Sequence, residues 1–404
     1  MLSVQEAESI ILEQVSVPDE ADMEAVSLEV ASGRILAAPV TSDLDFPHWD
    51  NSAMDGYAVR HADLAGRPAD LAIVEEIPAG SSPKKTLQPG QAARIFTGAC
   101  LPEGADTVVM QEETRRNGDR VQILATPESG AFVRHRGSYY KAGEPLLPGG
   151  IVLGAAEMAV LAAAQCLRVP VYRPLRVALL STGNELVRPD RPLGPGQLVD
   201  SNQYGLAAWV QQMGAEPVRL GIIPDRPEAL KSAIAKAILT ADVVLSSGGV
   251  SVGEYDHIPK LLSELGGKIG VQSVAVKPGK PLTFATFPNC SYFGLPGNPV
   301  SALVTCWRFV GPALKKRSGL AESFWRPQWM QVRSRHELRS GGKRETYLWG
   351  KLRSVDGEIE FALAPGSQNS GNLINLAQTD ALAVLPIGQT HVRAGESVRV
   401  LKVR

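Results

Sequence analysis

Hydrophobic positions change their spacing several times along the chain. Residues 1–15 place apolar side chains on one face of a helix, and Ser3 and Glu6 stand at capping-box spacing at its start. A second short helical pattern follows, and then a strand-like run up to Val40. The first forty residues therefore predict two short helices and a strand.

Between Leu71 and Leu124 the apolar positions follow the spacing of strands. Four runs are separated by turns rich in proline and glycine, which is the pattern of an all-β unit. Asn117-Gly118 lies between two of these runs and is typical of a type I′ hairpin. We expect a small all-β insert here, followed by a helix over 154–166, where alanine and leucine favour that structure.

From Leu175 onward, short apolar runs alternate with helical patterns. Runs with the length of buried strands lie at 175–182, 216–223 and 242–249. Helical patterns lie at 201–214, at 226–239 and from about Pro299 to Lys316. This alternation predicts a doubly wound α/β domain with a parallel sheet and helices on both faces. After Trp325 strands and turns return, which predicts a terminal β domain.

Length and charge limit the function classes. A chain of 404 residues is too long for one ordinary domain, so we expect three or four. The 41 basic and 42 acidic residues leave a net charge of -1, which does not indicate a nucleic-acid partner. The apolar stretches are too short for a membrane span, and the start of the chain lacks the basic region of an export signal. We therefore expect a cytoplasmic protein with no membrane or nucleic-acid partner.

The four cysteines are isolated from one another and from histidine in the sequence. This spacing disfavours a zinc site or a disulfide framework and indicates buried thiols. A protein without clustered soft ligands has to handle a metal through oxygen atoms and charge.

A glycine-rich loop follows the third predicted strand of the sheet. In an open parallel sheet, ligands bind beyond the carboxyl ends of the strands, where loops lead into helices. Ser247, Gly248 and Gly249 begin such a loop, whose backbone N–H groups can surround a phosphate. Glu254 and Tyr255 stand where a P-loop needs lysine and serine or threonine, so an ATPase is disfavoured. Taken alone, the loop is explained equally well as an ordinary turn.

Three carboxylates lie just past predicted strand ends. Glu185, Asp225 and Asp256 would meet at one edge of the sheet, beside the glycine-rich loop. An acidic group next to a phosphate-binding loop suggests Mg²⁺. Helix capping is the alternative, and it suits Asp225, just before Pro227, better than it suits Asp256.

Two lysines lie on a turn that prolines stiffen. Lys277 and Lys280 belong to the segment VKPGKP, and the fixed backbone limits how far their charges move. Such a turn suits a tetrahedral oxyanion, although a solvated basic turn explains the segment as well. Further along, Pro296 and Pro299 fix the backbone where another predicted strand leads into a helix.

Seven segments in one order make the chain similar to the MoeA family of molybdopterin molybdenumtransferases, which includes the gephyrin E domain. The segments are DNSAMDGYAV, RIFTGACLPEGADTVVMQEE, STGNEL, GQLVDSN, SSGGVSVGEYD, KPGKP and GLPGNPVSA. The resemblance runs from about the first predicted helix to the last predicted strand. Any one segment alone is a weak signal, and their common order is what identifies the family.

The resemblance implies a multidomain α/β and β protein. It predicts an elongated, discontinuous N-terminal domain, a β-rich insert, a central molybdopterin-binding-like α/β domain and a C-terminal β-barrel. The corresponding ranges are 1–44 with 140–172, 45–139, 173–322 and 323–404. It also implies a homodimer whose active site lies between the α/β domain of one subunit and the first two domains of the other. The further partners that the resemblance implies are a molybdopterin adenylyltransferase and molybdoenzymes.

The resemblance also assigns roles to residues. Asp55 and Thr97 would come from the partner's side of the site, while Glu185, Asp225 and Asp256 would serve catalysis and Mg²⁺. The positions expected near the pterin nucleotide are Asp200, Ser201, Asn202, Ser247, Gly248 and Gly249. The positions expected to hold molybdate are Lys277, Lys280 and Ser370, and Pro296 and Pro299 complete the predicted binding residues. The substrates implied are molybdate and adenylylated molybdopterin, with AMP as the released product.

Three positions depart from the family pattern. Gly137-Ser138-Tyr139 replaces the usual Gly-Glu-Asp, and Asn184 replaces an aspartate. Trp349 stands where the family has an arginine for molybdate, which predicts weaker molybdate binding unless Arg344 or Lys351 compensates. The lost family residues keep open a non-catalytic scaffold of the gephyrin E-domain type. A second alternative is adenylylation of the pterin, the preceding step, because that enzyme family shares the glycine-containing α/β domain, although the segments DNSAMDGYAV and IFTGA argue against it. The sequence does not distinguish molybdate from tungstate.

Overall fold

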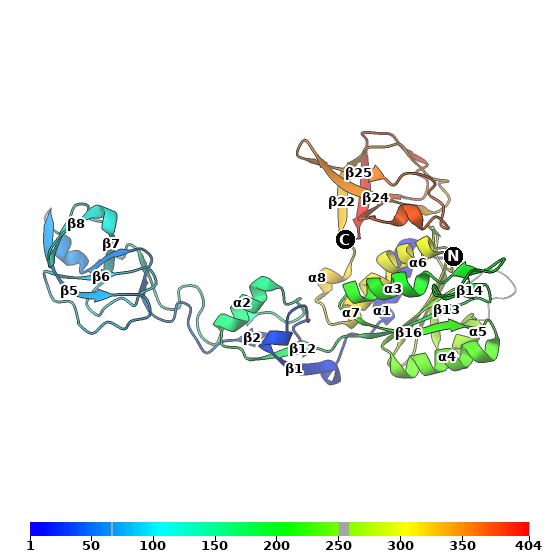
Figure 1. Ribbon diagram of the computed structural model, residues 1–404, viewed down its shortest axis with the longest axis horizontal. Coiled ribbons are helices and arrows are strands. Elements are labelled where there is room, and N and C mark those ends of the chain that lie inside the picture. The colour runs from blue at the N-terminus through cyan, green and yellow to red at the C-terminus, as the bar shows by residue number, and fades with distance from the viewer. Residues whose placement is uncertain (66–67, 250–257, 404) are drawn as a thin grey trace. The chain divides into compact units, whose positions relative to one another are not determined.

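The computed structural model describes residues 1–65, 68–249 and 258–403. The chain divides into two compact units (Figure 1). Unit 1 contains Met1–Ala38, Gly149–Gly154 and Arg168–Arg404, and unit 2 contains Pro39–Pro148 and Ala155–Leu167. The four-domain division expected from the sequence stays a prediction. Within the described residues, every helix falls short of the length and apolar character that crossing a membrane requires.

Unit 2 is built around a mixed sheet with the strand order β7-β4-β6-β5-β9-β8. Alternate side chains of its strands enter different cores, since Tyr57 packs in one and Ala58 in another. The strands are β2 (Val40–Thr41), β3 (Asn51–Ser52), β4 (Gly56–Val59), β5 (Ala69–Ile77), β6 (Gln91–Ile95), β7 (Thr107–Met110), β8 (Thr114–Asn117), β9 (Arg120–Ile123), β10 (Val133–Arg134) and β11 (Pro145–Leu147). The helices are η3 (His61–Leu64), η4 (Gln111–Glu113) and α2 (Ala155–Ala163). The strands predicted between Leu71 and Leu124 therefore form.

The hairpin turn between β8 and β9 differs from its prediction. Asn117 pairs directly with Arg120, so the central residues of the turn are Gly118 and Asp119. Only Gly118 has a positive φ, +62°, whereas a type I′ turn needs two such residues. The prediction of a hairpin is confirmed, but the turn is shifted by one residue and is not of type I′.

The first helix forms as predicted, and the second helical pattern does not. In α1 (Val4–Gln14), the Ser3 hydroxyl accepts a hydrogen bond from the Glu6 N–H at 3.2 Å, and the Glu6 carboxylate accepts one from the Ser3 N–H at 2.8 Å. The next segment holds strand β1 (Met23–Ser27) between the short helices η1 (Glu20–Asp22) and η2 (Leu28–Val30). β1 pairs with β12 (Arg168–Tyr172), and this long-range pairing overrides the local helical pattern.

The central sheet of unit 1 has the order β16-β13-β17-β21-β20-β18. Its strands are β13 (Arg176–Thr182), β16 (Glu216–Ile223), β17 (Val243–Ser247), β18 (Lys268–Ser273), β20 (Pro281–Thr286) and β21 (Ser291–Leu295). The pairings among β16, β13, β17 and β21 are parallel, as predicted. β20 pairs with β21 in antiparallel fashion, because a short turn joins them directly, and β18 also pairs with β20 in antiparallel fashion.

Helices cover both faces of this sheet, as the sequence predicts. Leu179 of β13 packs in a core with α1, α3 and α6, whereas Leu180 packs on the other face with α4 and α5. The helices are α3 (Asn202–Gln212), α4 (Pro227–Thr240), α5 (Ile258–Glu264), α6 (Pro299–Thr305), the π-helical segment η5 (Cys306–Val310), α7 (Gly311–Arg317) and α8 (Glu322–Trp325). α3 and α4 lie on opposite sides of β13 and β16 in Figure 1.

The C-terminal part of unit 1 is a closed β-barrel. β24 (Glu345–Val355) pairs with both β25 (Glu358–Leu363) and β26 (Ala381–Leu385), and the ring is completed by β28 (Ser397–Lys402) and β22 (Trp329–Ser334). The short elements β23 (Leu338–Arg339), β27 (His391–Val392) and η6 (Ile374–Leu376) lie in its connections. The barrel prediction is therefore confirmed.

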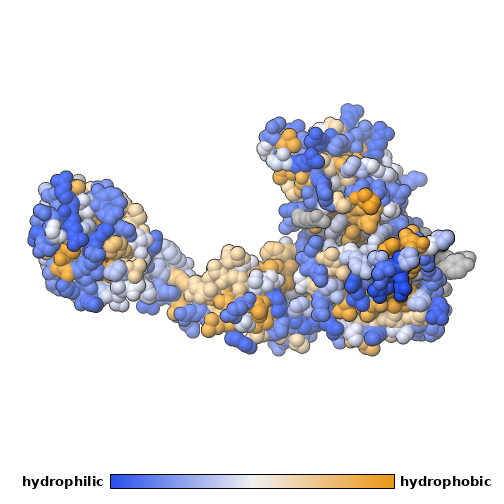
Figure 2. All heavy atoms as spheres, in the orientation of Figure 1, coloured by the Kyte–Doolittle hydropathy of each residue, from blue (hydrophilic) through white to orange (hydrophobic). Residues whose placement is uncertain are grey.

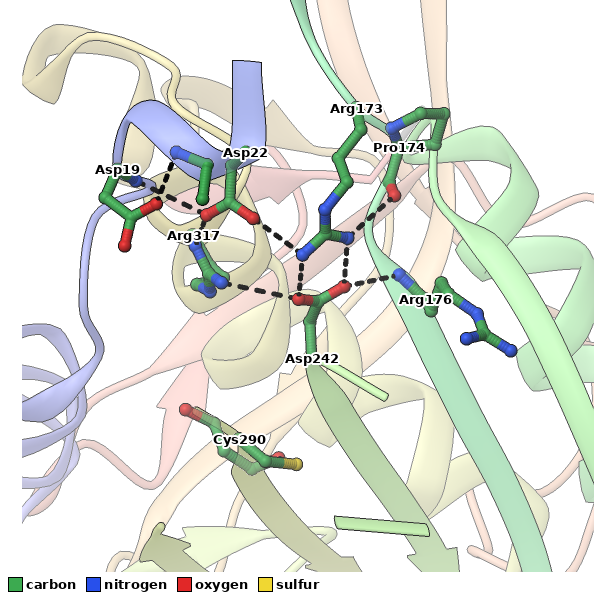
Figure 3. A network of polar contacts seen from close by, with 10 residues as sticks. Asp19, Asp22, Arg173, Pro174, Arg176, Asp242, Cys290 and Arg317 are labelled. Carbon is green, nitrogen blue, oxygen red and sulfur yellow. Dashed lines mark hydrogen bonds and ion pairs between the residues drawn. The ribbon is translucent and has the colours of Figure 1, made fainter. Parts of the chain in front are cut away.

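A network of ion pairs stands at the amino ends of β13 and β17 (Figure 3). The Asp242 carboxylate, just before β17, accepts two hydrogen bonds from the Arg173 guanidinium at 2.7 and 2.8 Å. It also accepts one from the Arg176 backbone N–H at 2.8 Å and one from Arg317 at 3.3 Å. Asp22 of η1 accepts from the same two guanidinium groups, at 2.6 and 2.7 Å. The network therefore ties the N-terminal segment, the sheet and α7 together.

Candidate functional site

The carboxyl ends of β13, β17 and β21 lie at one edge of the central sheet, because these strands are parallel neighbours. β13 ends at Thr182, β17 at Ser247 and β21 at Leu295. A loop that contains glycine follows each strand, and the loop after β21 leads directly into α6. This edge is where an open α/β sheet binds its ligands.

Two cavities adjoin at this edge. The sheet-edge cavity has a volume of about 400 Å³, and the basic cavity, between the sheet and the barrel, has about 620 Å³. They adjoin because Pro281, Pro296 and Asn298 line both. Of the predicted residues, the sheet-edge cavity is lined by Glu185, Asp200, Ser201, Asn202, Ser247, Gly248, Pro296 and Pro299. The basic cavity is lined by Lys277, Lys280, Pro296 and Ser370.

A buried polar chain forms the floor of the sheet-edge cavity. The Asp200 carboxylate accepts hydrogen bonds from the Ser181 hydroxyl at 3.0 Å and from the Gln203 N–H at 3.2 Å. The hydroxyls of Ser181 and Ser247 are 3.1 Å apart. Burial raises the pKa of Asp200, and its hydrogen bonds offset this only in part. The chain fixes the end of β13 against the end of β17 and the start of α3.

Gly248 allows the glycine-rich loop to pass close to β13. Its φ is +87°, and a Cβ there would lie 2.2 Å from the Thr182 carbonyl oxygen. Gly249 also has a positive φ, +67°, but does not line the cavity. The described part of this loop therefore requires glycine for two reasons, backbone conformation and close approach.

The loops after β13 and β16 carry two of the three predicted carboxylates and contact each other. Glu185 is exposed and lines the sheet-edge cavity. Asp225 is also exposed, and its carboxylate lies 3.5 Å from the Thr182 hydroxyl. The Asn184 amide oxygen accepts a hydrogen bond from the Asp225 N–H at 3.3 Å. Asn184, which departs from the family pattern, therefore joins the two loops. Asp256 lies outside the described residues.

The oxygen atoms of this region fit a hard cation such as Mg²⁺. Carboxylates are available from Glu185 and Asp225, a hydroxyl from Thr182 and an amide oxygen from Asn184. Among the residues that the structure describes, no three histidine, cysteine, aspartate or glutamate side chains form a preassembled metal cluster. Glu185 and Asp225 are thus the described residues that would hold the ion.

The basic cavity gathers positive charge. Lys277, Lys280, Arg339 and Arg344 line it, and its described lining contains no aspartate or glutamate. Arg339 forms an ion pair with Glu337, and the Arg344 guanidinium donates to the Val276 carbonyl at 3.3 Å. Hydroxyl and amide groups complete the walls. Such a site binds an anion that accepts hydrogen bonds.

The lysine turn is held between the sheet and the barrel. β19 (Val276–Lys277) pairs in parallel with the start of β24, which brings Lys277 beside the barrel. The Lys280 carbonyl accepts a hydrogen bond from the Val274 N–H at 3.0 Å. Gly279 has a φ of +105°, and a Cβ there would lie 2.6 Å from the Thr305 hydroxyl. The turn is therefore built into the wall and is not a freely solvated loop.

Trp349 does not offer its side-chain N–H to the basic cavity. The side chain is buried in the core, and its indole N–H donates to the Asn375 amide oxygen at 2.9 Å. Arg344 lines the cavity, whereas the Lys351 ammonium lies outside its lining and donates to Gln378. Of the two cations expected to compensate for Trp349, Arg344 is the one placed to do so. Weaker molybdate binding caused by Trp349 stays a prediction.

Asp55 and Thr97 lie together in unit 2. The Asp55 carboxylate accepts hydrogen bonds from the Thr97 backbone N–H at 2.7 Å and from its hydroxyl at 2.8 Å. The pKa of Asp55 is lowered, mainly by the hydrogen bond from the Thr97 backbone N–H. Tyr139, the other departure, has an exposed side chain. The resemblance placed Asp55 and Thr97 on the partner's side of the site. The structure shows that they bond to each other, and their role in the site stays a prediction.

Sequence reasoning missed several lining residues. Arg339 and Asn298 were not singled out, and Ser181 was not recognised as the link between Asp200 and Ser247. Ser181 ends a buried strand run just before the STGNEL loop, a position that could have indicated it. Arg339 carried no local signal, because the closure of the barrel brings it to the cavity.

Comparisons with known proteins match three successive regions of the chain. Residues 2–164 match the MoeA N-terminal region (domain I and II), 178–316 match a probable molybdopterin binding domain, and 331–403 match the MoeA C-terminal region (domain IV). The chain is 59% identical to a molybdopterin molybdenumtransferase of Nostoc sp., over 100% of this chain and 94% of the relative. It is 34% identical to one of Haemophilus influenzae, over 99% and 98%. A solved molybdopterin biosynthesis moeA protein of Pyrococcus horikoshii has a TM-score of 0.85 at 28% identity, over 100% of both chains.

Proposed function

The chain belongs to the MoeA family of molybdopterin molybdenumtransferases, enzymes of molybdenum cofactor biosynthesis, and we propose that it transfers molybdenum from molybdate to adenylylated molybdopterin, with release of AMP. One observation carries this proposal. A polar, glycine-lined cavity adjoins a cavity that gathers cations, and the two share a wall. The first suits a nucleotide and the second an oxyanion, so the two substrates would meet at the common wall.

Molybdate would occupy the basic cavity. It is a hard dianion whose oxygen atoms only accept hydrogen bonds, so ammonium, guanidinium and hydroxyl groups hold it without sulfur ligands. Lys277, Lys280 and Arg344 supply the charge, and Ser370 supplies a hydroxyl. Tungstate has the same shape and charge and would enter the same cavity.

The adenylylated pterin would lie along the sheet edge. Gly248 brings backbone close to the end of β13, and the α3 N-terminus begins beside Asp200, Ser201 and Asn202. A helix N-terminus and glycine-rich backbone favour a phosphate. The dithiolene sulfurs of the pterin would then point across the shared wall toward molybdate.

Mg²⁺ would be held by Glu185 and Asp225, together with Asp256. When bound, such an ion neutralises negative charge on phosphate oxygens. The role of the protein side chains is to keep carboxylate oxygens beside the nucleotide phosphates. Replacing Glu185 or Asp225 with alanine should abolish AMP release and leave the fold intact, because both side chains are exposed.

The proposed reaction needs no covalent bond to the protein and no change in the oxidation state of molybdenum. Two sulfurs of the pterin replace oxygen ligands of molybdate. The pyrophosphate bond breaks, and AMP leaves with one additional oxygen on its phosphorus. The remaining displaced oxygen leaves as water.

We further propose a cytoplasmic homodimer with a shared active site. Asp55 and Thr97 belong to unit 2, whereas both cavities belong to unit 1. A second copy also suits α2, whose sequence AAEMAVLAA is apolar apart from Glu157 but has only Leu161 fully buried. Figure 2 shows apolar residues gathered on the surface near this helix. An apolar, largely exposed helix favours an interface with another protein chain.

The test follows AMP in a mixture of purified protein, adenylylated molybdopterin, Mg²⁺ and molybdate. AMP release should depend on molybdate, and Lys277→Gln should raise the molybdate concentration needed for half-maximal release. Lys343→Gln is the matched control, because Lys343 is an exposed lysine of the barrel that does not line the cavity. If molybdate releases no AMP, the scaffold function replaces this proposal. If pterin and ATP yield pyrophosphate, the adenylyltransferase replaces it.

A further inference from the structure

Asn298 occupies the wall that the two cavities share. It lines both of them, and it lies between Gly297 and Pro299 in the loop that leads from β21 into α6. The Asn202 side chain, in the sheet-edge cavity, donates a hydrogen bond to the Gly297 carbonyl at 2.8 Å. The backbone on both sides of Asn298 is thus held in place, by this hydrogen bond and by the proline ring.

The Asn298 side chain does not cap α6, although its position at the start of this helix suggests capping. Asn298 is the N-cap of α6, where asparagine normally accepts a hydrogen bond from an N–H of the first turn. Here its side chain makes no such bond. Its amide group instead donates to the Ser370 hydroxyl oxygen at 3.1 Å, in the loop between β25 and η6 of the barrel. Asn298 is of a residue type that is preferred for capping, yet its side chain bonds to a residue of the basic cavity. This indicates a role in that cavity.

This hydrogen bond sets the direction of the Ser370 hydroxyl hydrogen. A serine hydroxyl has one hydrogen to donate and two lone pairs that accept, whereas an amide –NH₂ only donates. Because the Ser370 oxygen accepts from Asn298, its own hydrogen stays available for another acceptor. Ser370 lines the basic cavity, whose walls gather cations and would hold an anion. Among the hydrogen bonds of the described residues, none has the Ser370 hydroxyl as its donor, and an oxyanion in the cavity would accept its hydrogen.

We propose that Asn298 is a positioning residue that makes Ser370 a hydrogen-bond donor to the oxyanion in the basic cavity. The proposal rests on the proposed function, since it takes molybdate as the occupant. It assigns Asn298 no contact with the reacting atoms. Its effect passes through Ser370 alone, and so removing Ser370 should make Asn298 irrelevant to molybdate.

The experiment measures equilibrium binding of molybdate to the purified full-length protein by calorimetry, without pterin. Asn298→Ala and Ser370→Ala should each weaken binding about two- to tenfold, the value of one hydrogen bond. The double variant should bind no more weakly than Ser370→Ala. Asn372→Ala is the control, because Asn372 lies in the same loop, donates to Ser367 at 3.2 Å and does not line the cavity.

The variant Asn298→Asp tests the proposal more stringently. A carboxylate accepts hydrogen bonds, so it would take the Ser370 hydrogen for itself and would also repel the anion. Binding should weaken more than in Asn298→Ala, by more than about tenfold. Because Asn298 is exposed, each variant should keep the thermal midpoint of the wild type.

The outcomes separate the two proposals. If the wild type binds molybdate and Asn298→Ala binds as well as the Asn372→Ala control, the positioning role is wrong. Equal losses for Asn298→Ala in the presence and absence of Ser370 also overturn it. If the wild type itself binds no molybdate, the proposed function fails, independently of Asn298.

Discussion

Removing the charge of Asp242 should destabilise unit 1 strongly. The Asp242 side chain is only 7% exposed, and its carboxylate accepts hydrogen bonds from Arg173, Arg317 and the Arg176 backbone (Figure 3). In Asp242→Asn, an amide of nearly the same size faces these donors, and Asp22 alone is left to balance two guanidinium groups. Removing one partner of a buried ion pair typically costs about 3–5 kcal/mol. This is a large share of the roughly 5–15 kcal/mol that stabilises a folded domain.

Urea unfolding followed by tryptophan fluorescence measures this loss. Unit 1 contains Trp209, Trp307, Trp325, Trp329 and Trp349, whereas unit 2 contains Trp49, so the signal reports mainly on unit 1. The denaturant slope in urea is about 1–3 kcal/mol per molar for small proteins and rises with size, so the midpoint of the large unit 1 should fall by roughly 1 M. Asp190→Asn is the control, because the Arg188–Asp190 pair is exposed and should contribute less than about 1 kcal/mol.

The pH dependence of the loss gives a second check. Burial raises the pKa of both Asp22 and Asp242, but the adjacent Arg317 and Arg173 more than offset it, so both pKa values lie below the ordinary value near 4. A lowered folded-state pKa means stability that is complete above the unfolded pKa and is lost as the pH falls through the folded value. The difference between wild type and Asp242→Asn should therefore shrink below about pH 4. A midpoint shift no larger than that of Asp190→Asn would refute the reasoning.

Three other predictions concern the site. Arg344→Gln should raise the molybdate concentration for half-maximal AMP release about tenfold or more, as expected for a charged hydrogen bond, whereas Lys351→Gln, outside the cavity, should change it little; equal effects would contradict the cavity geometry. Gly248→Ala should abolish AMP release and lower the thermal midpoint, because its Cβ would lie 2.2 Å from a backbone oxygen; normal activity would show that the loop can shift. Mixing Asp55→Asn with Asp256→Asn subunits should restore activity above either variant alone, and the absence of recovery would argue against a shared site.

The chain alone determined the features that depend on neighbouring residues. The Ser3–Glu6 capping box and the strands that end at Thr182 and Ser247 follow from local spacing, and all three form as expected. The order of the seven family-like segments also identified the family, because each segment is an unbroken run of residues that can be recognised in the sequence. Local patterns predict such features well, since the interactions that create them span only a few residues.

Tertiary structure decided the features that depend on distant partners. β1 is a strand because β12 pairs with it, and the ring of β24, β25, β22, β28 and β26 closes through pairings far apart in the sequence. The same closure buries Trp349 and brings Arg344 to the lysine turn. The contact of Asn298 with Ser370 joins residues 72 positions apart. Periodicity carries no information about which distant segments meet, and so the adjoining cavities could be found only in the folded chain.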